Sequence, residues 1–190
     1  MGGDIYLESR LSADDILSFG FQNVAIATGA TWRRDGVARA HVVPMPADAS
    51  MPIFTPDDLM AGKIPDGNVA LFDDDHYYMG GVLAELMARR GAKVTLVTPS
   101  AFVSDWTRNT LEQSAIHRRL AECGVTIVLN RTIRRIDAGG VVSACVYTGV
   151  EQPIAADAVV LVTSRQQDDG VWTTLKARAD QWADHGINTI

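Results

Sequence analysis

The sequence contains few of the residues and segments that define several common classes of protein. Its 190 residues include only two cysteines, Cys123 and Cys145, and neither lies in a C-x-x-C pair, so the usual ligand set of a metal or iron–sulfur site is missing. No hydrophobic run approaches the roughly 20 residues that a membrane-spanning helix needs. The N-terminus also lacks the hydrophobic stretch of a signal peptide. These absences favour a cytoplasmic protein that does not bind membranes.

Basic residues are outnumbered by acidic ones. Seventeen Lys and Arg against 23 Asp and Glu leave a net charge of −6, which argues against nucleic acids and anionic membrane surfaces as partners. Hydrophobic residues make up 47% of the chain and charged residues 21%, the usual balance for a folded domain, so disorder is excluded as the main state. The length suffices for one sizeable core, or for one domain plus part of another.

A regular alternation of strands and helices begins at Asn68. The strands are continuously hydrophobic, which is typical of strands buried on both faces of a parallel sheet. Glycines follow the helices, where they supply the left-handed conformation that ends them. The predicted strands and helices are, in chain order, residues 69–72, 79–90, 93–98, 110–123 and 125–129.

After the third strand the pattern changes. Residues 132–137, 141–148 and 152–155 predict an antiparallel meander, and residues 158–163 predict a final buried strand. This order is the plan of a Rossmann-like dinucleotide-binding domain whose last crossover is a hairpin instead of a helix. The predicted fold class is therefore α/β, a three-layer structure built on a parallel sheet with a β-meander crossover.

The segments on either side of this alternation are less regular. Before it, the patterns predict a short strand at Ile5 to Leu7, a helix capped by Ser12 and a β-rich run at 23–30. After it, residues 171–185 predict a helical tail. One strand cannot bury both its faces alone, so we expect these flanks to belong to a neighbouring domain, to pair with each other, or to be covered by a second copy of the chain.

The turn after the first buried strand decides the functional interpretation. A dinucleotide-binding unit has a G-x-G-x-x-G turn at this point, because glycines let backbone N–H groups approach a pyrophosphate. In this chain Asp73 and Asp75 stand where the first two glycines belong, and only Gly80 and Gly81 survive, slightly displaced. A carboxylate there repels a phosphate by about 3 kcal/mol at ~5 Å and an effective dielectric constant of about 20. The sequence therefore predicts a dinucleotide fold that has lost its dinucleotide.

The same turn allows a second interpretation. Asp73, Asp74, Asp75 and His76 are residue types that bind hard cations or other metals. Consecutive residues seldom point to one centre, however, so we expect a solvated, helix-capping acidic turn and no metal. None of the four histidines has a partner at metal-ligand or catalytic-triad spacing.

Five stretches give the chain a resemblance to a known family. They resemble the C-terminal portion of the trimethylamine dehydrogenase and histamine dehydrogenase group, which belongs with the 2,4-dienoyl-CoA reductase-like flavoproteins. Together they cover nearly the whole chain. The stretches are NVAIATGATWRRDG, FTPDDLMAGK, NVALFDDDHYYMGGVLAELMARRGAKVTLVTPS, TLEQSAIHRRLAECGV and ADAVVLVTSR.

The resemblance implies a specific domain organisation. In that family a barrel carrying FMN and a [4Fe–4S] cluster precedes a medium domain that holds ADP or FAD, into which a small NAD(P)H-binding-like domain is inserted. Residues 1–35 then correspond to part of the medium domain, 36–67 to a linker, 68–165 to the small domain and 166–190 to a return segment. We therefore expect a fragment without catalytic residues of its own, with the barrel and the rest of the medium domain as partners.

The resemblance also implies one set of binding residues. Ala27, Thr28 and Gly29 match the segment whose backbone lies near the ADP or flavin of the medium domain. Gly80 and Gly81 match the remains of the dinucleotide turn. Neither set implies that a cofactor binds to the fragment alone.

Three functions remain open at this point. The first is a scaffolding domain of an iron–sulfur flavoprotein oxidoreductase that acts on an amine. The second is a working NAD(P)H-binding domain of a 2,4-dienoyl-CoA reductase-like NADH:flavin oxidoreductase. The third is a free-standing binding module unrelated to redox chemistry. The acidic turn favours the first, because it argues against a nicotinamide substrate.

Overall fold

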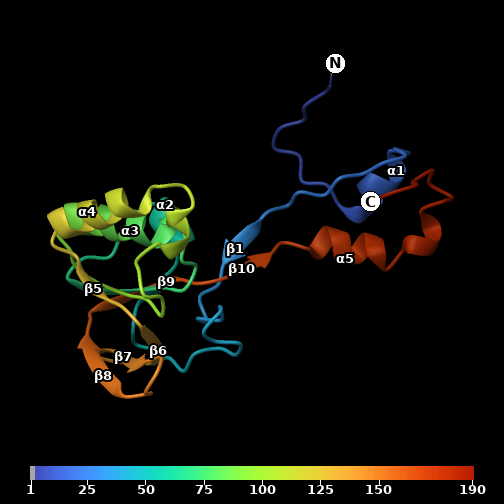
Figure 1. Cartoon of the computed structure of the whole chain (residues 1–190). Coiled ribbons are helices and arrows are strands. Elements are labelled where there is room, and N and C mark those ends of the chain that lie inside the picture. The colour runs from blue at the N-terminus through green and yellow to red at the C-terminus, as the bar shows by residue number, and fades with distance from the viewer. Residues whose placement is uncertain (1–2) are drawn as a thin grey trace. The chain divides into compact units, whose positions relative to one another are not determined.

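The computed structural model describes residues 3–190. Met1 and Gly2, the first two residues of the expected medium-domain piece 1–35, lie outside the described residues. The chain divides into two compact units (Figure 1). Among the described residues, unit 1 comprises 3–30 and 167–190, and unit 2 comprises 31–166. The two units are described separately below.

Unit 2 is built on a five-stranded parallel sheet with the strand order β2-β9-β3-β4-β5. The central strand β3 pairs with β4 on one side and β9 on the other, and five of its six residues are buried. The predicted α/β class with a parallel sheet is therefore confirmed. The strands are β2 (Ile53–Phe54), β3 (Asn68–Asp73), β4 (Lys93–Val97), β5 (Thr126–Val128) and β9 (Ala158–Val162).

Helices cover one face of this sheet (Figure 1). Leu83 and Met87 of α3 and Leu120 of α4 are almost fully buried, and they pack in one core with Leu71 and Leu96 from the sheet. Burying such side chains is worth about 1.5–3 kcal/mol each. The helical elements are α2 (Pro56–Met60), α3 (Tyr78–Arg89), η1 (Asp105–Arg108) and α4 (Gln113–Glu122).

An antiparallel meander covers the opposite face (Figure 1). It consists of β6 (Arg131–Asp137), β7 (Gly140–Cys145) and β8 (Glu151–Ala155). Ile133 and Ile136 pack against Phe72 of β3 in a second core. Side chains alternate between the faces of a strand, so Leu71 and Phe72 enter different cores. This explains the continuous hydrophobic pattern of β3 and confirms the predicted meander.

Unit 1 has a small core of its own. Helix α1 (Ala13–Ser18) begins at Ser12, whose side chain forms a capping box with Asp15. Residues Ile16 and Leu17 of this helix pack against Leu175 of α5 (Gly170–Lys176). Further along the chain, a short 3-10 helix, η2, spans Ala179–Gln181.

The strand expected at Ile5 to Leu7 is wrong. Both residues are more than 80% exposed and neither has a strand partner in the described part of the chain. The β-rich run at 23–30 is mostly irregular: Asn23 forms one bridge with Thr189. Only its last residue enters a strand, β1 (Ala30–Trp32), which pairs with β10 (Arg165–Gln167) in a two-stranded sheet. Without neighbouring strands, a hydrophobic run does not form a ladder.

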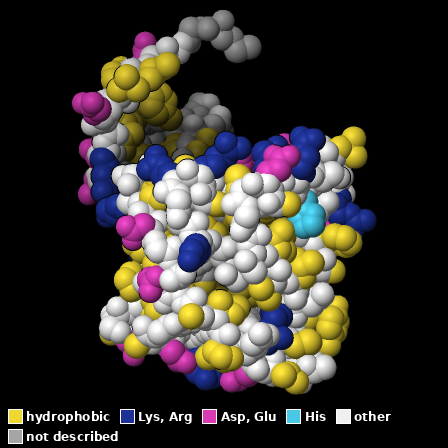
Figure 2. All heavy atoms as spheres, turned by 90° about the vertical axis from the view of Figure 1, so that its left-hand side faces the viewer, with side chains coloured by type: hydrophobic (Ala, Val, Ile, Leu, Met, Phe, Trp, Pro, Cys, Tyr) yellow, Lys and Arg dark blue, Asp and Glu magenta, His cyan; other side chains and the backbone are white. Residues whose placement is uncertain are grey.

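Charged groups of both signs are interspersed on the surface of unit 2 around α4, β5 and β8 (Figure 2). In unit 2, Glu85 pairs with both Arg89 and Arg119, at 2.9 and 3.0 Å. Exposed pairs of this kind are worth about 1 kcal/mol or less. Within residues 3–190, no helix is long and apolar enough to cross a membrane.

Candidate functional site

The acidic turn of unit 2 is the most distinctive feature of its parallel sheet. Asp73 is the last residue of β3 and lies opposite Val162 of β9. The backbone N–H groups of Asp74 and Asp75 both donate to the Val162 carbonyl, at 2.9 and 3.2 Å. The turn therefore lies at the carboxyl ends of the central strands, where open α/β sheets bind their ligands.

The Asp73 side chain is fully buried, and so is nearly all of Asp74. The expectation of a solvated acidic turn is therefore wrong for these two residues, whereas Asp75 is half-buried. The Asp73 carboxylate accepts a hydrogen bond from the His76 backbone N–H at 3.1 Å through Oδ1. Its Oδ2 atom is buried and has no hydrogen-bond partner, an arrangement that costs free energy for an ionised carboxylate.

Burial raises the pKa of the Asp73 carboxyl to about 7, and the nearby Asp75 carboxylate adds to the shift. The His76 backbone N–H and the His76 ring act in the opposite direction. Desolvation is the largest cause, because the charged form loses its hydration without gaining enough partners. Perturbed carboxyl groups of this kind are enriched in functional sites, and they also occur in purely structural networks.

Asp74 and His76, in the same turn as Asp73, contact each other and other parts of unit 2. The Ala40 N–H donates to Asp74 Oδ2 at 2.7 Å. His76 Nε2 lies 3.1 Å from Asp74 Oδ1, at ion-pair distance but without a hydrogen bond between them. The other ring nitrogen of His76, Nδ1, lies 3.4 Å from the Thr98 hydroxyl. The backbone of His76 is left-handed, with φ of 62°. His76 is thus held between the ends of β3 and β4.

Gly80 and Gly81 have packing roles in the first turns of α3. A Cβ atom on Gly80 would lie 2.5 Å from both Cγ and Oδ2 of Asp73. A Cβ atom on Gly81 would lie 2.6 Å from a methyl group of Ile116 in α4. Such distances are far below van der Waals contact. The absence of a side chain at Gly80 therefore makes room for the Asp73 carboxyl group, and at Gly81 for the neighbouring helix.

A pocket of about 330 Å³ opens beside the acidic turn within unit 2. Asp74 and Asp75 line it, together with Thr163 and Ser164 at the end of β9. Arg165 also lines it and stacks over the Trp32 ring at 4.2 Å. The remaining lining residues are Ala38 and Arg39.

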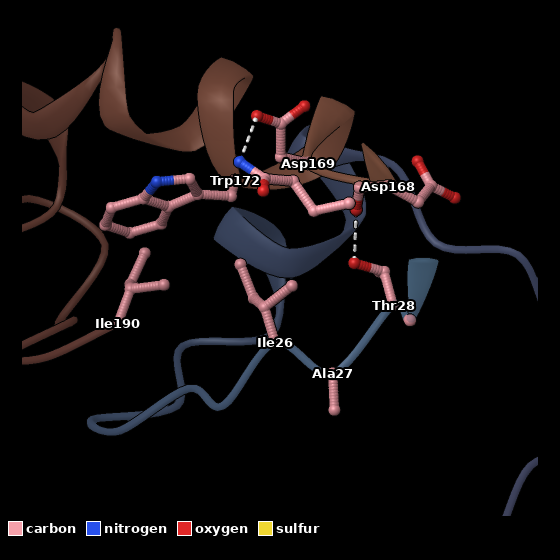
Figure 3. Close-up of a pocket in the computed structure, with 9 residues that line it drawn as sticks. Ile26, Ala27, Thr28, Asp168, Asp169, Trp172 and Ile190 are labelled. Carbon is pink, nitrogen blue, oxygen red and sulfur yellow. Dashed lines mark hydrogen bonds between the residues drawn. The ribbon is translucent and has the colours of Figure 1, made fainter. Parts of the chain in front are cut away.

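Unit 1 contains a second pocket, of about 420 Å³, which Ala27, Thr28 and Gly29 line (Figure 3). The Thr28 hydroxyl donates to the Asp168 carbonyl, and the Asp168 N–H donates to the Gly29 carbonyl at 3.0 Å. The Gln167 amide donates to Asp169 at 3.3 Å. The pocket therefore has acidic and backbone groups next to a hydrophobic part formed by Ile26, Trp172 and Ile190.

The predicted binding residues thus fall into two separate places. Ala27, Thr28 and Gly29 share the pocket of unit 1, and Asp73 and Gly80 are packed against each other in unit 2. Sequence reasoning missed Asp168 and Asp169, which follow Gly29 by about 140 residues and carry no motif. It expected Trp172 only as part of the helical tail at 171–185.

Metal-ligating side chains do not gather in the described part of the chain. Among residues 3–190 there is no group of three or more His, Cys, Asp or Glu side chains that could hold a metal ion. Cys123 and Cys145 are both free and half-buried.

The described fold can be compared with known proteins. The family model of the OYE-like second alpha/beta domain matches residues 54–152. Histamine dehydrogenase from Rhizobium sp. 4-9 is 59% identical over 96% of this chain, with a TM-score of 0.91. The 6-hydroxypseudooxynicotine amine oxidase from Pseudomonas geniculata N1 is 38% identical over 98% of the chain, with a TM-score of 0.89.

A curated relative agrees with these structures. Dimethylamine dehydrogenase from Hyphomicrobium sp. (strain x) is 33% identical over 96% of this chain. In all three comparisons the chain spans about 28% of the length of the relative. The chain therefore corresponds to one part of much longer proteins.

Proposed function

This chain belongs to the family of the OYE-like second alpha/beta domain, and on that premise we propose that it is an auxiliary part of an iron–sulfur flavoprotein oxidoreductase that acts on an amine. Its role in that protein is scaffolding, and the chemistry takes place elsewhere in the parent chain. The observation that carries this proposal is the 59% identity to a histamine dehydrogenase over 96% of the chain.

The names of the other relatives support the same substrate class. One is a dimethylamine dehydrogenase and another an amine oxidase. The matched part of each amounts to about 28% of its length, which leaves room for a barrel and for the rest of a medium domain. We propose residues 68–165 as an NAD(P)-binding-like domain, and residues 1–35 and 166–190 as pieces of the medium domain. We propose 36–67 as the linker, the last part of which adds β2 and α2 to unit 2.

The pocket of unit 1 is suited to part of an ADP or FAD molecule. The exposed residues Thr28 and Gly29 line one open pocket of about 420 Å³ together with Trp172. The carboxylates of Asp168 and Asp169 would repel a phosphate there. We therefore assign these residues to an uncharged part of the bound molecule, and the phosphates to residues elsewhere in the parent.

The described residues do not provide the ligands of an iron–sulfur cluster. Cys123 follows α4 and Cys145 ends β7, and within residues 3–190 neither belongs to a group of three or more metal-ligating side chains. We propose that the cluster and FMN both belong to the barrel. When bound there, FMN would take up the electrons released by amine oxidation. This chain's own residues would then hold the neighbouring domain in place.

We expect this chain to show no saturable binding of NADH or NADPH at millimolar concentration. The buried Asp73 fills the space beside Gly80, and the strand after it ends without an acidic residue that could bind a ribose. Isothermal titration calorimetry with both nucleotides is the measurement. A dissociation constant below ~100 μM, which corresponds to about −5.5 kcal/mol, would contradict the proposal and favour a working NAD(P)H-binding domain.

We also expect the purified chain to be colourless. Flavins and iron–sulfur clusters both absorb visible light, and we have assigned FMN and the cluster to the barrel of the parent. The check is an absorbance spectrum between 350 and ~600 nm combined with iron analysis, with the intact parent protein as the positive control. A flavin-like or cluster-like band that co-purifies with this chain in stoichiometric amount would refute the assignment.

The parent protein offers the direct test of the substrate class. We expect its flavin to be bleached under anaerobic conditions by an alkylamine or by an aromatic ethylamine such as histamine, and not by NADH. Dimethylamine and histamine are the first substrates to try, because the named relatives act on them. Rapid bleaching by NADH and none by any amine would overturn the proposed function.

A further inference from the structure

The contact between Asp73 and Gly80 joins two positions of the expected dinucleotide turn. Asp73 ends β3, and Gly80 lies in the first turn of the 12-residue helix α3. Because a Cβ on Gly80 would lie 2.5 Å from Asp73 Oδ2, that oxygen occupies the space immediately against the helix. The Asp73 side chain is 0% exposed, and Oδ2 has no hydrogen-bond partner.

The first turn of α3 has the features of an anion-binding helix N-terminus. Its N-cap residue, Tyr77, provides no side-chain hydrogen bond to the free N–H groups. The His76 N–H, just before the helix, donates to Asp73 Oδ1 at 3.1 Å. Free N–H groups and the helix dipole attract negative charge at this end. In this chain the group at this position is a carboxyl side chain of the protein itself.

We propose that the Asp73 side chain is an internal plug in a pyrophosphate-binding turn, and that the turn binds the pyrophosphate group of a nucleotide once this side chain is removed. The proposal rests on the proposed function, because it explains how an NAD(P)-binding-like domain lacks its ligand. It adds that the loss of nucleotide binding has a local cause. One carboxymethyl group fills the space between the end of β3 and Gly80, here called the cradle, while the strand, the helix and Gly80 remain in place.

Space and charge can be separated by substitution. Asp73→Asn removes the negative charge and keeps the volume, whereas Asp73→Gly removes both. Asp75→Asn is added to each variant to remove the half-buried carboxylate that lines the neighbouring pocket. The two double variants, D73G/D75N and D73N/D75N, then carry the same charge and differ only in the plug.

The binding experiment titrates inorganic pyrophosphate and ADP into the wild-type chain and both double variants by calorimetry. We expect D73G/D75N to bind pyrophosphate with a dissociation constant of about 1–5 mM, at least about tenfold more tightly than D73N/D75N, a difference of about 1.4 kcal/mol or more. Equal binding by the two variants, or no binding by a folded D73G/D75N, would overturn the plug. If D73G/D75N does not fold, D73A/D75N is judged by the same criterion.

A stability measurement tests the contact independently of any ligand. We expect Gly80→Ala to lower the melting temperature of the wild-type chain, and to leave it unchanged or raise it in the D73G background, where the space is free. Gly170→Ala is the matched control, since a Cβ on this helical glycine meets nothing within 4 Å. Equal effects of Gly80→Ala in both backgrounds would show that Asp73 does not fill the cradle.

The outcomes distinguish this inference from the proposed function. If the wild-type chain binds NADH, the proposed function fails whatever the variants do. If the wild-type chain binds no nucleotide and D73G/D75N binds no pyrophosphate, the plug is wrong and the proposed function stands. Tight binding of pyrophosphate by the wild-type chain would overturn the plug alone, because the cradle would then be open.

Discussion

Replacing Gly140 with Ala should be the most destabilising small substitution in unit 2. Gly140 begins β7 with φ of 143°, a conformation that L-residues rarely adopt. An added Cβ would overlap the carbonyl oxygen of Ile154 and lie 2.8 Å from the Ala156 nitrogen. These are backbone atoms of β8 and the residue after it, so no side-chain rotation can relieve the clash.

The expected loss is about 4 kcal/mol or more, because backbone strain and overpacking each cost about 1–3 kcal/mol and the clash with a paired strand adds to them. The measurement is urea-induced unfolding followed by far-UV circular dichroism. Gly139→Ala is the matched control: the position is adjacent, and its Cβ would meet nothing within 4 Å. A loss below ~1 kcal/mol for G140A, in the range of an ordinary substitution, would show that β7 and β8 are not packed as described.

The fold of unit 2 could be predicted because its central strand β3 is hydrophobic at the positions of both its faces. Val69 and Leu71 enter the core under the helices, and Ala70 and Phe72 enter the core under the meander. A strand buried on both faces has no polar positions, and the helices between such strands end at glycines. These patterns depend on local spacing, so they can be recognised in the sequence without any knowledge of long-range contacts.

Unit 1 was harder to predict for a physical reason. Leu7 belongs to a hydrophobic run, yet it is 82% exposed and forms no strand. A strand is stabilised by its neighbours, and within residues 3–190 no strand or bridge pairs with residues 5–7. Helix α1, by contrast, was predictable, because its capping box from Ser12 to Asp15 is local.

The candidate site shows the same limit. The acidic residues at the turn were visible in the sequence, and their spacing against the dinucleotide fingerprint placed Asp73 and Asp75 at the first two glycine positions. The burial of Asp73 was not predictable, because it depends on Gly80 lying directly over the end of β3. In the pocket of unit 1, Thr28 bonds to Asp168, which lies 140 residues further along the chain. No short sequence motif indicates such a contact.

Asp73 should dominate the pH dependence of the chain's stability between pH 5 and 7.5. The pKa of this carboxyl is about 7 in the folded chain, whereas an unfolded Asp has a pKa of about 3.9. Between these values the folded state holds a proton that the unfolded state lacks. Stability is therefore expected to fall as the pH rises, and to level off above about pH 7.

The size of this effect follows from linkage at 1.36 kcal/mol per pKa unit, which gives a loss of about 2–3 kcal/mol between pH 5 and 7.5. Asp35, Asp58 and Asp157 have lowered pKa values because they accept hydrogen bonds or ion pairs. Their contribution is lost only as the pH falls below about 4, outside this window. The decline between pH 5 and 7.5 is therefore not caused by these groups.

Asp73→Asn isolates the titration, because an amide keeps the shape of the carboxyl group and does not ionise in this range. Its absolute stability is affected by the buried amide, so the informative quantity is the slope of the unfolding free energy against pH. We expect the wild-type slope to be steeply negative from pH 5 to 7 and the D73N slope to be close to zero, as measured by urea unfolding at half-unit steps. Parallel slopes for the two proteins would mean that Asp73 does not carry the proton, and that its buried carboxyl is ionised throughout by partners that compensate its desolvation.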